Sequence, residues 1–408
     1  METINLNGKT ILVTGAAGFI GSNLVKRLFK DLDNATIVGI DNMNDYYDVS
    51  LKEWRLKEID SLVPEGIKYV FIKGDIASKE TVDSLFSQYK PQVVVNLAAQ
   101  AGVRYSITNP DAYIQSNLIG FYNILEACRH SMDEVRCKKE DVNAQPSALS
   151  PQPSAFSPQP SALSPQPSAI SLQPSAFSPQ PYRGVEHLVY ASSSSVYGGN
   201  KKVPFSTDDR VDNPVSLYAA TKKSNELMAH CYSKLYNIPS TGLRFFTVYG
   251  PAGRPDMAYF GFTNKLLKGE TIQIFNYGNC RRDFTYVDDI VEGIVRVMQG
   301  APERKNGDDG LPVPPYAVYN IGGGQPENLL DFVTILQEEL VRAGVLPQDF
   351  DFEAHKQLVA MQPGDVPVTY ADSTALERDF GFTPKITLRE GLRHFAEWYK
   401  EYYNPAFF

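Results

Sequence analysis

The stretch that decides the fold is Ile11–Gly21, which reads ILVTGAAGFIG. A short apolar strand, Ile11–Thr14, leads directly into a glycine-rich turn, and a helical pattern begins at Phe19. The glycines let the backbone turn sharply, approach a ligand closely and pack the helix against the strand. The helix N-terminus then offers free N–H groups to phosphate. The stretch therefore predicts a pyrophosphate site at Gly15, Gly18, Phe19, Ile20 and Gly21.

Strands and helices continue to alternate along the chain. Further strands are expected at Thr36–Asp41, Val93–Ala98 and Leu188–Ser192. The expected helices are Phe19–Phe29, Asn117–His130, Leu217–Tyr236 and Gly391–Tyr402, and Gly300–Pro315 is expected to be a surface loop. Alternating strands and helices predict an α/β protein with a Rossmann-type, doubly wound parallel sheet. The helix at 217–236 is expected to bury an apolar face made of Leu217, Ala220, Leu227, Cys231 and Leu235.

The expected domains follow from this pattern. A Rossmann domain that binds the dinucleotide is expected at residues 1–131 and 185–245. A smaller substrate-binding domain takes mainly residues 246–408, with segments near 283–298 and 316–323 returning to the Rossmann domain. Residues 132–184 form an insertion, because from Gln145 the chain repeats a Gln-Pro-Ser-Ala-apolar-Ser-Pro unit every seven residues. Such frequent prolines forbid a helix, so a disordered, extended segment outside the fold is predicted.

Polar residues at strand ends predict the rest of the cofactor site. Asp41 ends the second strand, where a carboxylate bonds the adenosine ribose and repels a 2′-phosphate. This favours NAD over NADP. The neighbouring Asn42, then Asp75 and Ile76 after the third strand, and the run Leu97, Ala98, Ala99 and Gln100 after the fourth are expected to complete the site.

Composition narrows the class of protein. The net charge is −8 and no basic block occurs, which argues against nucleic acid as a partner. The four cysteines show no metal-ligand spacing, so no metal site is predicted. No secretory signal or membrane-length apolar run is visible, and a cytoplasmic protein is therefore expected.

Tyr218 and Lys222 are the candidate catalytic pair. They stand four residues apart at the start of a predicted helix and therefore share one face. An ammonium beside a phenol favours the phenolate, so Tyr218 could act as a base. A serine run that includes Ser193, Ser194 and Ser195 follows an upstream strand, at the sheet edge where ligands bind. A hydroxyl there could bond the substrate oxygen that Tyr218 deprotonates.

Together these motifs resemble the extended short-chain dehydrogenase/reductase family over nearly the whole chain outside the repeat. Within it, several longer stretches resemble the UDP-glucuronate 4-epimerases: Asp41–Val49, Ala101–Ser106, Arg244–Pro251, Gly253–Ala258, Arg282–Asp289 and Met361–Val366. The resemblance implies an NAD-dependent 4-epimerase that interconverts UDP-glucuronate and UDP-galacturonate through a 4-keto intermediate, commonly as a homodimer.

The resemblance also implies residue roles. Tyr218 is the base and acid at O4, Lys222 bonds the nicotinamide ribose, and Ser193 supplies the catalytic hydroxyl. Asn117 supports the cofactor. The substrate positions are Arg104, Ser193, Ser194, Ser195, Thr247, Arg254, Arg282 and Gln362. Arg254 could read either the hexuronate carboxylate or the UDP, and the sequence does not separate the two.

Other members of the same fold are the rival functions. Dehydratases and UDP-glucuronate decarboxylases carry an acidic residue where this chain has Ser195, which argues against both. UDP-glucose 4-epimerases usually have arginine at the position of Gln362 and asparagine at that of Thr247, so they remain the alternative. A non-catalytic NAD-sensing protein would tend to lose the Tyr218 and Lys222 pair, which is intact here.

Overall fold

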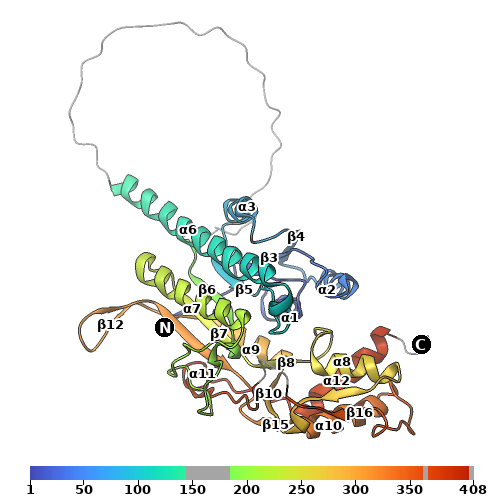
Figure 1. Cartoon of the computed structure of the whole chain (residues 1–408). Helices are drawn as coiled ribbons and strands as arrows, with labels where there is room; N and C mark the ends of the chain where they lie inside the picture. The colour runs from blue at the N-terminus through green and yellow to red at the C-terminus, as the bar shows by residue number, and fades with distance from the viewer. Residues whose placement is uncertain (144–183, 362–365, 404–408) are drawn as a thin grey trace, which may run out of the picture.

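The computed structural model describes residues 1–143, 184–361 and 366–403 (Figure 1). The seven-residue repeat, and the expectation that it is disordered, lie outside the described residues. So does Gln362, one of the expected substrate positions.

A seven-stranded parallel sheet forms the centre of the protein, in the order β14-β7-β6-β5-β2-β3-β4. Its strands are β2 (Thr10–Thr14), β3 (Ala35–Asp41), β4 (Ile67–Lys73), β5 (Val93–Asn96), β6 (His187–Ser193), β7 (Ser240–Phe245) and β14 (Tyr316–Ile321). The order reverses between β2 and β5, where a doubly wound sheet opens a crevice at the carboxyl ends of its strands. This large parallel sheet in an α/β chain is the predicted fold class.

Helices cover both faces of the sheet (Figure 1). Ile11 and Val13 join one core cluster with α1 (Phe19–Asp31), α2 (Val49–Ser61) and α9 (Val287–Met298). Leu12 and Val94 join a second cluster with α3 (Lys79–Tyr89), α6 (Gly120–Asn143) and α7 (Leu217–Tyr236). Because successive strand residues point to opposite faces, both faces must be apolar, which explains the uninterrupted Val and Ile runs.

A second lobe lies beyond the carboxyl edge of the sheet, at the bottom of Figure 1. It holds a three-stranded sheet of β8 (Thr247–Tyr249), β10 (Arg281–Tyr286) and β15 (Pro326–Asn328), and a parallel pair of β9 (Ile272–Ile274) and β16 (Lys356–Leu358). Its helices are α8 (Ala258–Leu267), α10 (Leu329–Arg342) and α12 (Leu388–Tyr403), whereas α11 (Thr374–Phe380) packs against β14 of the central sheet. Aromatic side chains such as Phe260, Phe332 and Phe395 fill its interior.

Short elements complete the chain. They are β1 (Glu2–Thr3), α4 (Tyr105–Thr108), α5 (Pro110–Tyr113), a π-helix η1 (Ile114–Ile119), the 3-10 turns η2 (Ser194–Tyr197) and η3 (Phe275–Gly278), β11 (Gly300–Ala301), β12 (Lys305–Asn306) and β13 (Pro312–Val313). Within the described ranges, no helix is long and apolar enough to cross a membrane.

Four details of the sequence prediction were wrong. The segment Gly300–Pro315 is more than a loop, because β11 pairs with β1 and β12 pairs with β13. The strand expected at Val93–Ala98 ends at Asn96, where the chain turns away to line a cavity. The helix expected to end at His130 continues to Asn143.

The fourth error concerns the face of α7. Leu227 and Leu235, expected to be buried, are 59% and 64% exposed. The buried face carries Thr221, Lys222, Asn225 and Glu226 instead. The spacing of apolar residues therefore does not mark the buried face of α7. Its inward face lines the cavity and supplies a buried polar network.

Candidate active site

The carboxyl edge of the sheet opens into a cavity at the crossover between β2 and β5. Nearly every residue expected to hold the cofactor lines it: Gly15, Gly18, Phe19, Ile20, Gly21, Asp41, Asn42, Asp75, Ile76, Leu97, Ala98, Ala99, Gln100, Tyr218 and Lys222. Gly15 has a φ of 69°, and a Cβ on Gly21 would lie 2.1 Å from the Gly15 carbonyl oxygen. The loop therefore needs glycine at both positions to bring its backbone to the start of α1. These features fit a dinucleotide whose pyrophosphate faces the helix N-terminus.

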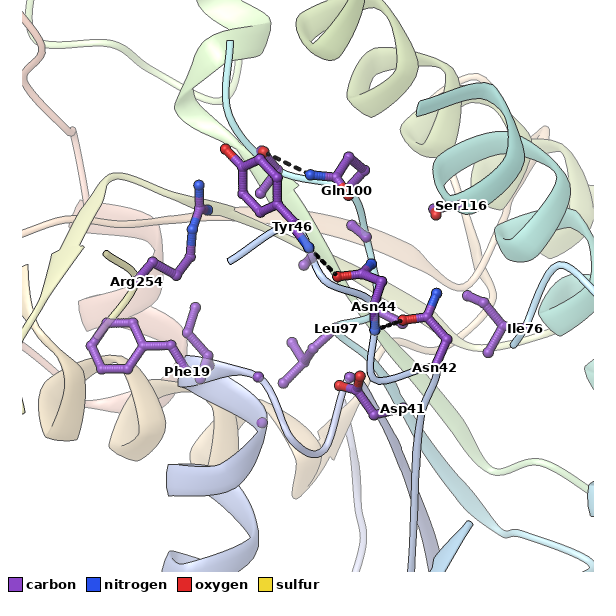
Figure 2. Close-up of a pocket in the computed structure, with 18 of the residues that line it drawn as sticks. Phe19, Asp41, Asn42, Asn44, Tyr46, Ile76, Leu97, Gln100, Ser116 and Arg254 are labelled. Atoms are coloured by element: carbon purple, nitrogen blue, oxygen red, sulfur yellow. Dashed lines mark hydrogen bonds between the residues drawn. The ribbon is translucent and has the colours of Figure 1, made fainter. Parts of the chain in front are cut away.

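Polar side chains gather at the end of β3. Figure 2 shows Asp41, Asn42 and Ile76 at one end of the cavity, with Arg254 and Phe19 at the other. The Asp41 carboxylate accepts a hydrogen bond from the Met43 N–H at 2.9 Å. Asn42 Nδ2 donates to Asp75 at 3.1 Å, which ties the ends of β3 and β4 together. Asp41 is thus held where a ribose diol could bind.

Lys52 approaches Asp41 from α2. Its Nζ lies 3.8 Å from Asp41 Oδ1 and donates to both oxygens of Asn44, at 2.8 Å and 2.9 Å. Burial lowers the pKa of Lys52, and the charge of Asp41 opposes that shift. The lysine fixes the turn after β3, so Asp41 keeps a defined orientation.

Tyr218, Ser193 and Lys222 meet at the junction of β6 and α7. The Ser193 hydroxyl accepts the Ser195 N–H at 3.1 Å, and Ser193 and Tyr218 line the same cavity. Burial raises the pKa of Tyr218, while the hydrogen bond with Ser193 and the charge of Arg254 oppose this shift. A phenol with these two neighbours can give up its proton more readily than burial alone would allow.

Lys222 lies deeper in the same cavity. Its Nζ donates to the Ala191 carbonyl oxygen at 2.8 Å. Burial lowers the pKa of Lys222 to about 8. The positive charge that acts on Tyr218 in this structure is that of Arg254, so the expected tuning of Tyr218 by Lys222 stays a prediction.

Asn117 is the one expected cofactor residue in the described part of the chain that does not line the cavity. It is 2% exposed and sits in the π-helix η1. Its side chain accepts the Gln100 N–H at 2.8 Å and donates to the Gln100 carbonyl and to Thr221, both at 3.0 Å. Asn117 therefore holds the cavity wall from behind. The role of Asn117 in supporting the cofactor stays a prediction.

A second cavity of about 770 Å³ adjoins the first and reaches into the smaller lobe. Arg104, Ser193, Ser194, Ser195, Thr247, Arg254 and Arg282 line it, which are the expected substrate positions within the described residues. Ser193, Tyr218 and Arg254 line both cavities. The two cavities thus meet at the proposed reacting centre.

Arg254 is held by residues that the sequence reasoning missed. Its Nε and Nη2 donate to the two oxygens of Asp256, at 3.0 Å and 2.5 Å. Tyr46 Oη donates to the same carboxylate at 3.1 Å, and burial together with the charge of Asp256 raises the pKa of Tyr46 to about 12. Tyr46 and Asp256 belonged to quoted motifs, Asp41–Val49 and Gly253–Ala258, but their meeting depends on the tertiary fold.

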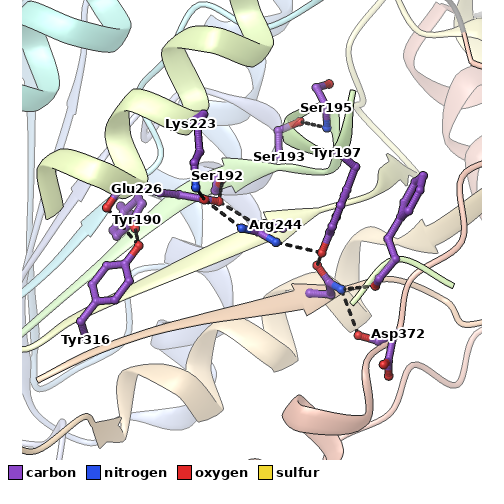
Figure 3. A network of polar contacts seen from close by, with 12 residues as sticks. Tyr190, Ser192, Ser193, Ser195, Tyr197, Lys223, Glu226, Arg244, Tyr316 and Asp372 are labelled. Atoms are coloured by element: carbon purple, nitrogen blue, oxygen red, sulfur yellow. Dashed lines mark hydrogen bonds and ion pairs between the residues drawn. The ribbon is translucent and has the colours of Figure 1, made fainter. Parts of the chain in front are cut away.

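A buried polar network supports the reacting centre from below (Figure 3). Glu226 lies one turn after Lys222 on α7, and it accepts from Ser192 at 2.7 Å and from Arg244 Nε at 2.8 Å. Arg244 also donates to Tyr197 at 3.0 Å, and Tyr197 donates to Asn320 at 2.7 Å. The network connects α7, β6, β7, η2 and β14, so it fixes the strand end that presents Ser193.

The comparisons with known proteins identify the family of this chain. A family model described as the NAD dependent epimerase/dehydratase family matches residues 11–322. The chain belongs to this family.

Relatives over the full length are similar as well. The chain is 45% identical to Protein CapI of Staphylococcus aureus, covering 97% of this chain and 99% of that protein. It is 40% identical to UDP-glucuronate 4-epimerase 4 of Arabidopsis thaliana, covering 99% and 78%. The structure of UDP-glucuronic acid 4-epimerase from Bacillus cereus, in complex with UDP-glucuronic acid and NAD, superposes with a TM-score of 0.70 at 28% identity, covering 96% and 99%.

Proposed function

We propose that this epimerase-family protein is an NAD-dependent 4-epimerase that interconverts UDP-glucuronate and UDP-galacturonate. The observation that carries the proposal is that Arg254 and Tyr218 both line the two cavities where these meet, and that the charge of Arg254 opposes the rise that burial causes in the pKa of the phenol. In a hexuronate, the carboxylate carbon is attached to C5, next to the C4 that reacts. A guanidinium beside the base at O4 is therefore placed for this carboxylate.

The cavities that Arg254 and Arg282 line suggest different substrate groups for the two arginines. Arg254 lines both cavities, whereas Arg282 lines only the larger one, on β10 of the smaller lobe. Arg282 is thus better placed for the UDP phosphates. The sequence left open whether Arg254 binds the hexuronate carboxylate or the UDP, and we propose the carboxylate.

The proposed reaction uses the residues at the junction of the cavities. Tyr218 accepts the O4 proton, and the Ser193 hydroxyl, oriented by the Ser195 N–H, bonds the same oxygen. A bound NAD would supply the hydride acceptor and donor for C4, with the hydride returned to the opposite face of the 4-keto sugar. Tyr218 then returns the proton. Since no net oxidation occurs, a bound NAD would not need to be exchanged, and Lys222, which lines the cofactor cavity, would hold its ribose.

A chromatographic assay with UDP-glucuronate and no added NAD tests the function. We expect UDP-galacturonate to form with the NAD that copurifies. Faster turnover of UDP-glucose would favour the alternative, UDP-glucose 4-epimerase. Release of CO₂ or a pentose product at a comparable rate would reject the proposed chemistry, because the 4-keto uronate is a β-keto acid. No turnover of any UDP-sugar would favour an NAD-sensing protein.

Replacing Arg254 by glutamine is expected to weaken UDP-glucuronate binding by about 10- to 150-fold, because one charge-assisted contact is lost. Affinity for UDP itself, which lacks the carboxylate, should change little. Calorimetric titration with both ligands measures the difference. An equal loss for the two ligands would place Arg254 on the UDP instead.

We also propose that the protein is a homodimer formed through α6 and α7, which pack against one another. Ile119 at the end of η1 and Tyr122 at the start of α6 are 41% and 43% exposed, and Leu227 and Leu235 on α7 are more exposed still. Large apolar side chains left exposed on two neighbouring helices are typical of a contact with another protein. An outward apolar stripe on α7 also explains why the sequence period pointed to the wrong face.

The double substitution Leu227→Asp and Leu235→Asp is expected to yield monomers of 45.4 kDa, because charges would be buried at the interface. Light scattering after size exclusion measures the mass. Leu311→Asp is the matched control, since Leu311 is 64% exposed like Leu235 but lies between β12 and β13. A native protein that is already monomeric would contradict the proposal. The cytoplasmic location and the absence of a nucleic-acid partner stay predictions from the sequence.

A further inference from the structure

Arg55 on α2 is a buried cation that neither the motifs nor the proposed reaction account for. Its side chain is among the largest that are fully buried, with 1% exposed. A guanidinium has five N–H groups, and the structure gives Arg55 five hydrogen bonds. Where those bonds go shows what this side chain can do.

Four of the five bonds reach two separate loops, and the fifth reaches the Tyr47 phenol. Nε and Nη2 donate to the Ala252 carbonyl oxygen at 3.0 Å and 2.7 Å, and Nη2 also donates to the Gly253 carbonyl at 3.0 Å. Nη1 donates to the Ala17 carbonyl at 3.0 Å and to Tyr47 Oη at 2.7 Å. Arg55 thus joins the glycine-rich loop before α1 to the loop that leads into Arg254.

The partners of Arg55 are carbonyl and phenol oxygens rather than carboxylates. Among the residues that the structure describes, no carboxylate forms an ion pair with it. A buried charge without a counter-ion is a costly way to stabilise a fold. The hydrogen bonds instead fit a role in which the planar guanidinium holds two backbone segments at a fixed position relative to each other.

The loop on the substrate side needs such support. Ala252 has a φ of 51°, in the left-handed region that residues with a Cβ avoid, and Gly250 has a φ of 145°. A Cβ on Gly253 would lie 1.7 Å from Tyr259 Oη. Strained backbone of this kind persists only where neighbours hold it. Arg254 follows directly, so the contacts of Arg55 determine where the Arg254 guanidinium can lie.

The loop on the cofactor side is the proposed pyrophosphate site. Ala17 precedes Gly18, the residue that caps α1, and Gly18 lines the cofactor cavity. We infer that Arg55 is a positioning residue that couples the cofactor loop at Ala17 to the substrate loop at Ala252–Arg254. Occupation of the cofactor cavity then favours the orientation of Arg254 that binds substrate. The substrate half of this inference rests on the proposed role of Arg254, and the cofactor half does not.

Arg55→Lys is the main test, because it keeps the charge but removes the fork that spans both loops. Using the full-length protein, we expect the Kd for NAD and the KM for UDP-glucuronate each to rise about tenfold, with a smaller change in kcat. Arg27→Lys is the matched control. Arg27 lies on α1 and pairs with Asp31 and Glu292, away from both loops, and neither constant should change.

A double-mutant cycle separates coupling from general destabilisation. In an Arg254→Gln background, Arg55→Lys should change KM by less than about twofold, because the group that it positions is already gone. If KM in the double variant rose by the product of the two single-variant factors, the coupling would be overturned. A loss of thermal stability in Arg55→Lys with both NAD affinity and KM unchanged would overturn it too.

A milder variant covers the case in which Arg55→Lys does not fold. Tyr47→Phe removes only the phenol that accepts from Nη1 and should shift both constants in the same direction by a smaller factor. An unchanged Kd and KM there would overturn the inference. If the wild type turned over no uronate, the proposed function would fail, while the NAD measurement would still test the contact with Ala17.

Discussion

Replacing Tyr218 by phenylalanine is expected to lower kcat for epimerisation by about 10²- to 10⁴-fold, the usual contribution of a positioned acid–base group. The change removes only the Oη atom. The ring that packs edge-on against Tyr113, with centroids 6.0 Å apart, is retained. The cofactor cavity should therefore keep its shape, and the variant should still copurify with NAD.

Initial rates by chromatography and the NAD content of the purified variant measure the two parts of this prediction. Tyr399→Phe is the matched control, because it also removes one buried phenol, whose hydrogen bond to Asn264 at 2.7 Å lies in the smaller lobe. The control should keep its rate. A Tyr218→Phe enzyme with more than about a tenth of the native kcat would remove Tyr218 from the proton transfer.

The second large effect is expected from Glu226→Gln, which should lower the free energy of unfolding by about 3 to 5 kcal/mol. Arg244 and Glu226 are each only 3% exposed, so the substitution leaves a buried guanidinium without its counter-ion. Burial raises the pKa of Glu226, but the hydrogen bond and charge of Arg244 outweigh it and the pKa is lowered overall. The carboxylate is therefore charged at neutral pH, and it is this charge that the variant removes.

Thermal denaturation of the NAD-loaded proteins measures the loss. Asp83→Asn is the matched control, because it breaks an exposed pair with Lys79 whose side chains are 53% and 49% exposed. Such pairs contribute about 0.5 kcal/mol or less. Equal shifts for the two variants would show that the network of Figure 3 does not stabilise the protein. The kcat should also fall in Glu226→Gln, since Ser192 bonds Glu226 and precedes Ser193.

The cofactor cavity was the part of the site most open to prediction. Its signals are local: a glycine with φ of 69° at Gly15, no room for a Cβ at Gly21, and a carboxylate at the end of a strand. The residues on the substrate side were predicted mainly from the resemblance to a known family. Its central contact, Arg254 with Asp256 and Tyr46, joins segments that lie 210 residues apart in the chain.

Helix α7 shows the limit of pattern reasoning. Its existence and its bounds, Leu217–Tyr236, followed from the sequence, as did the shared face of Tyr218 and Lys222. Which face of α7 points into the protein could not be predicted, because reasoning from the hydrophobic period takes the apolar residues to be the buried ones. In α7 the inward face carries the polar side chains of the site, and Leu227 and Leu235 remain outside.

The sequence by itself determined the strand–turn–helix at Ile11–Gly21 and the Tyr218–Lys222 pair, since backbone dihedrals and helical spacing act over a few residues. Only the tertiary structure decided which surfaces meet. It placed Arg254 beside Tyr218, moved Asn117 behind the cavity wall, and brought Arg55 to a loop 197 residues away. Contacts over such separations depend on the packing of the whole sheet and both lobes, which no short pattern encodes.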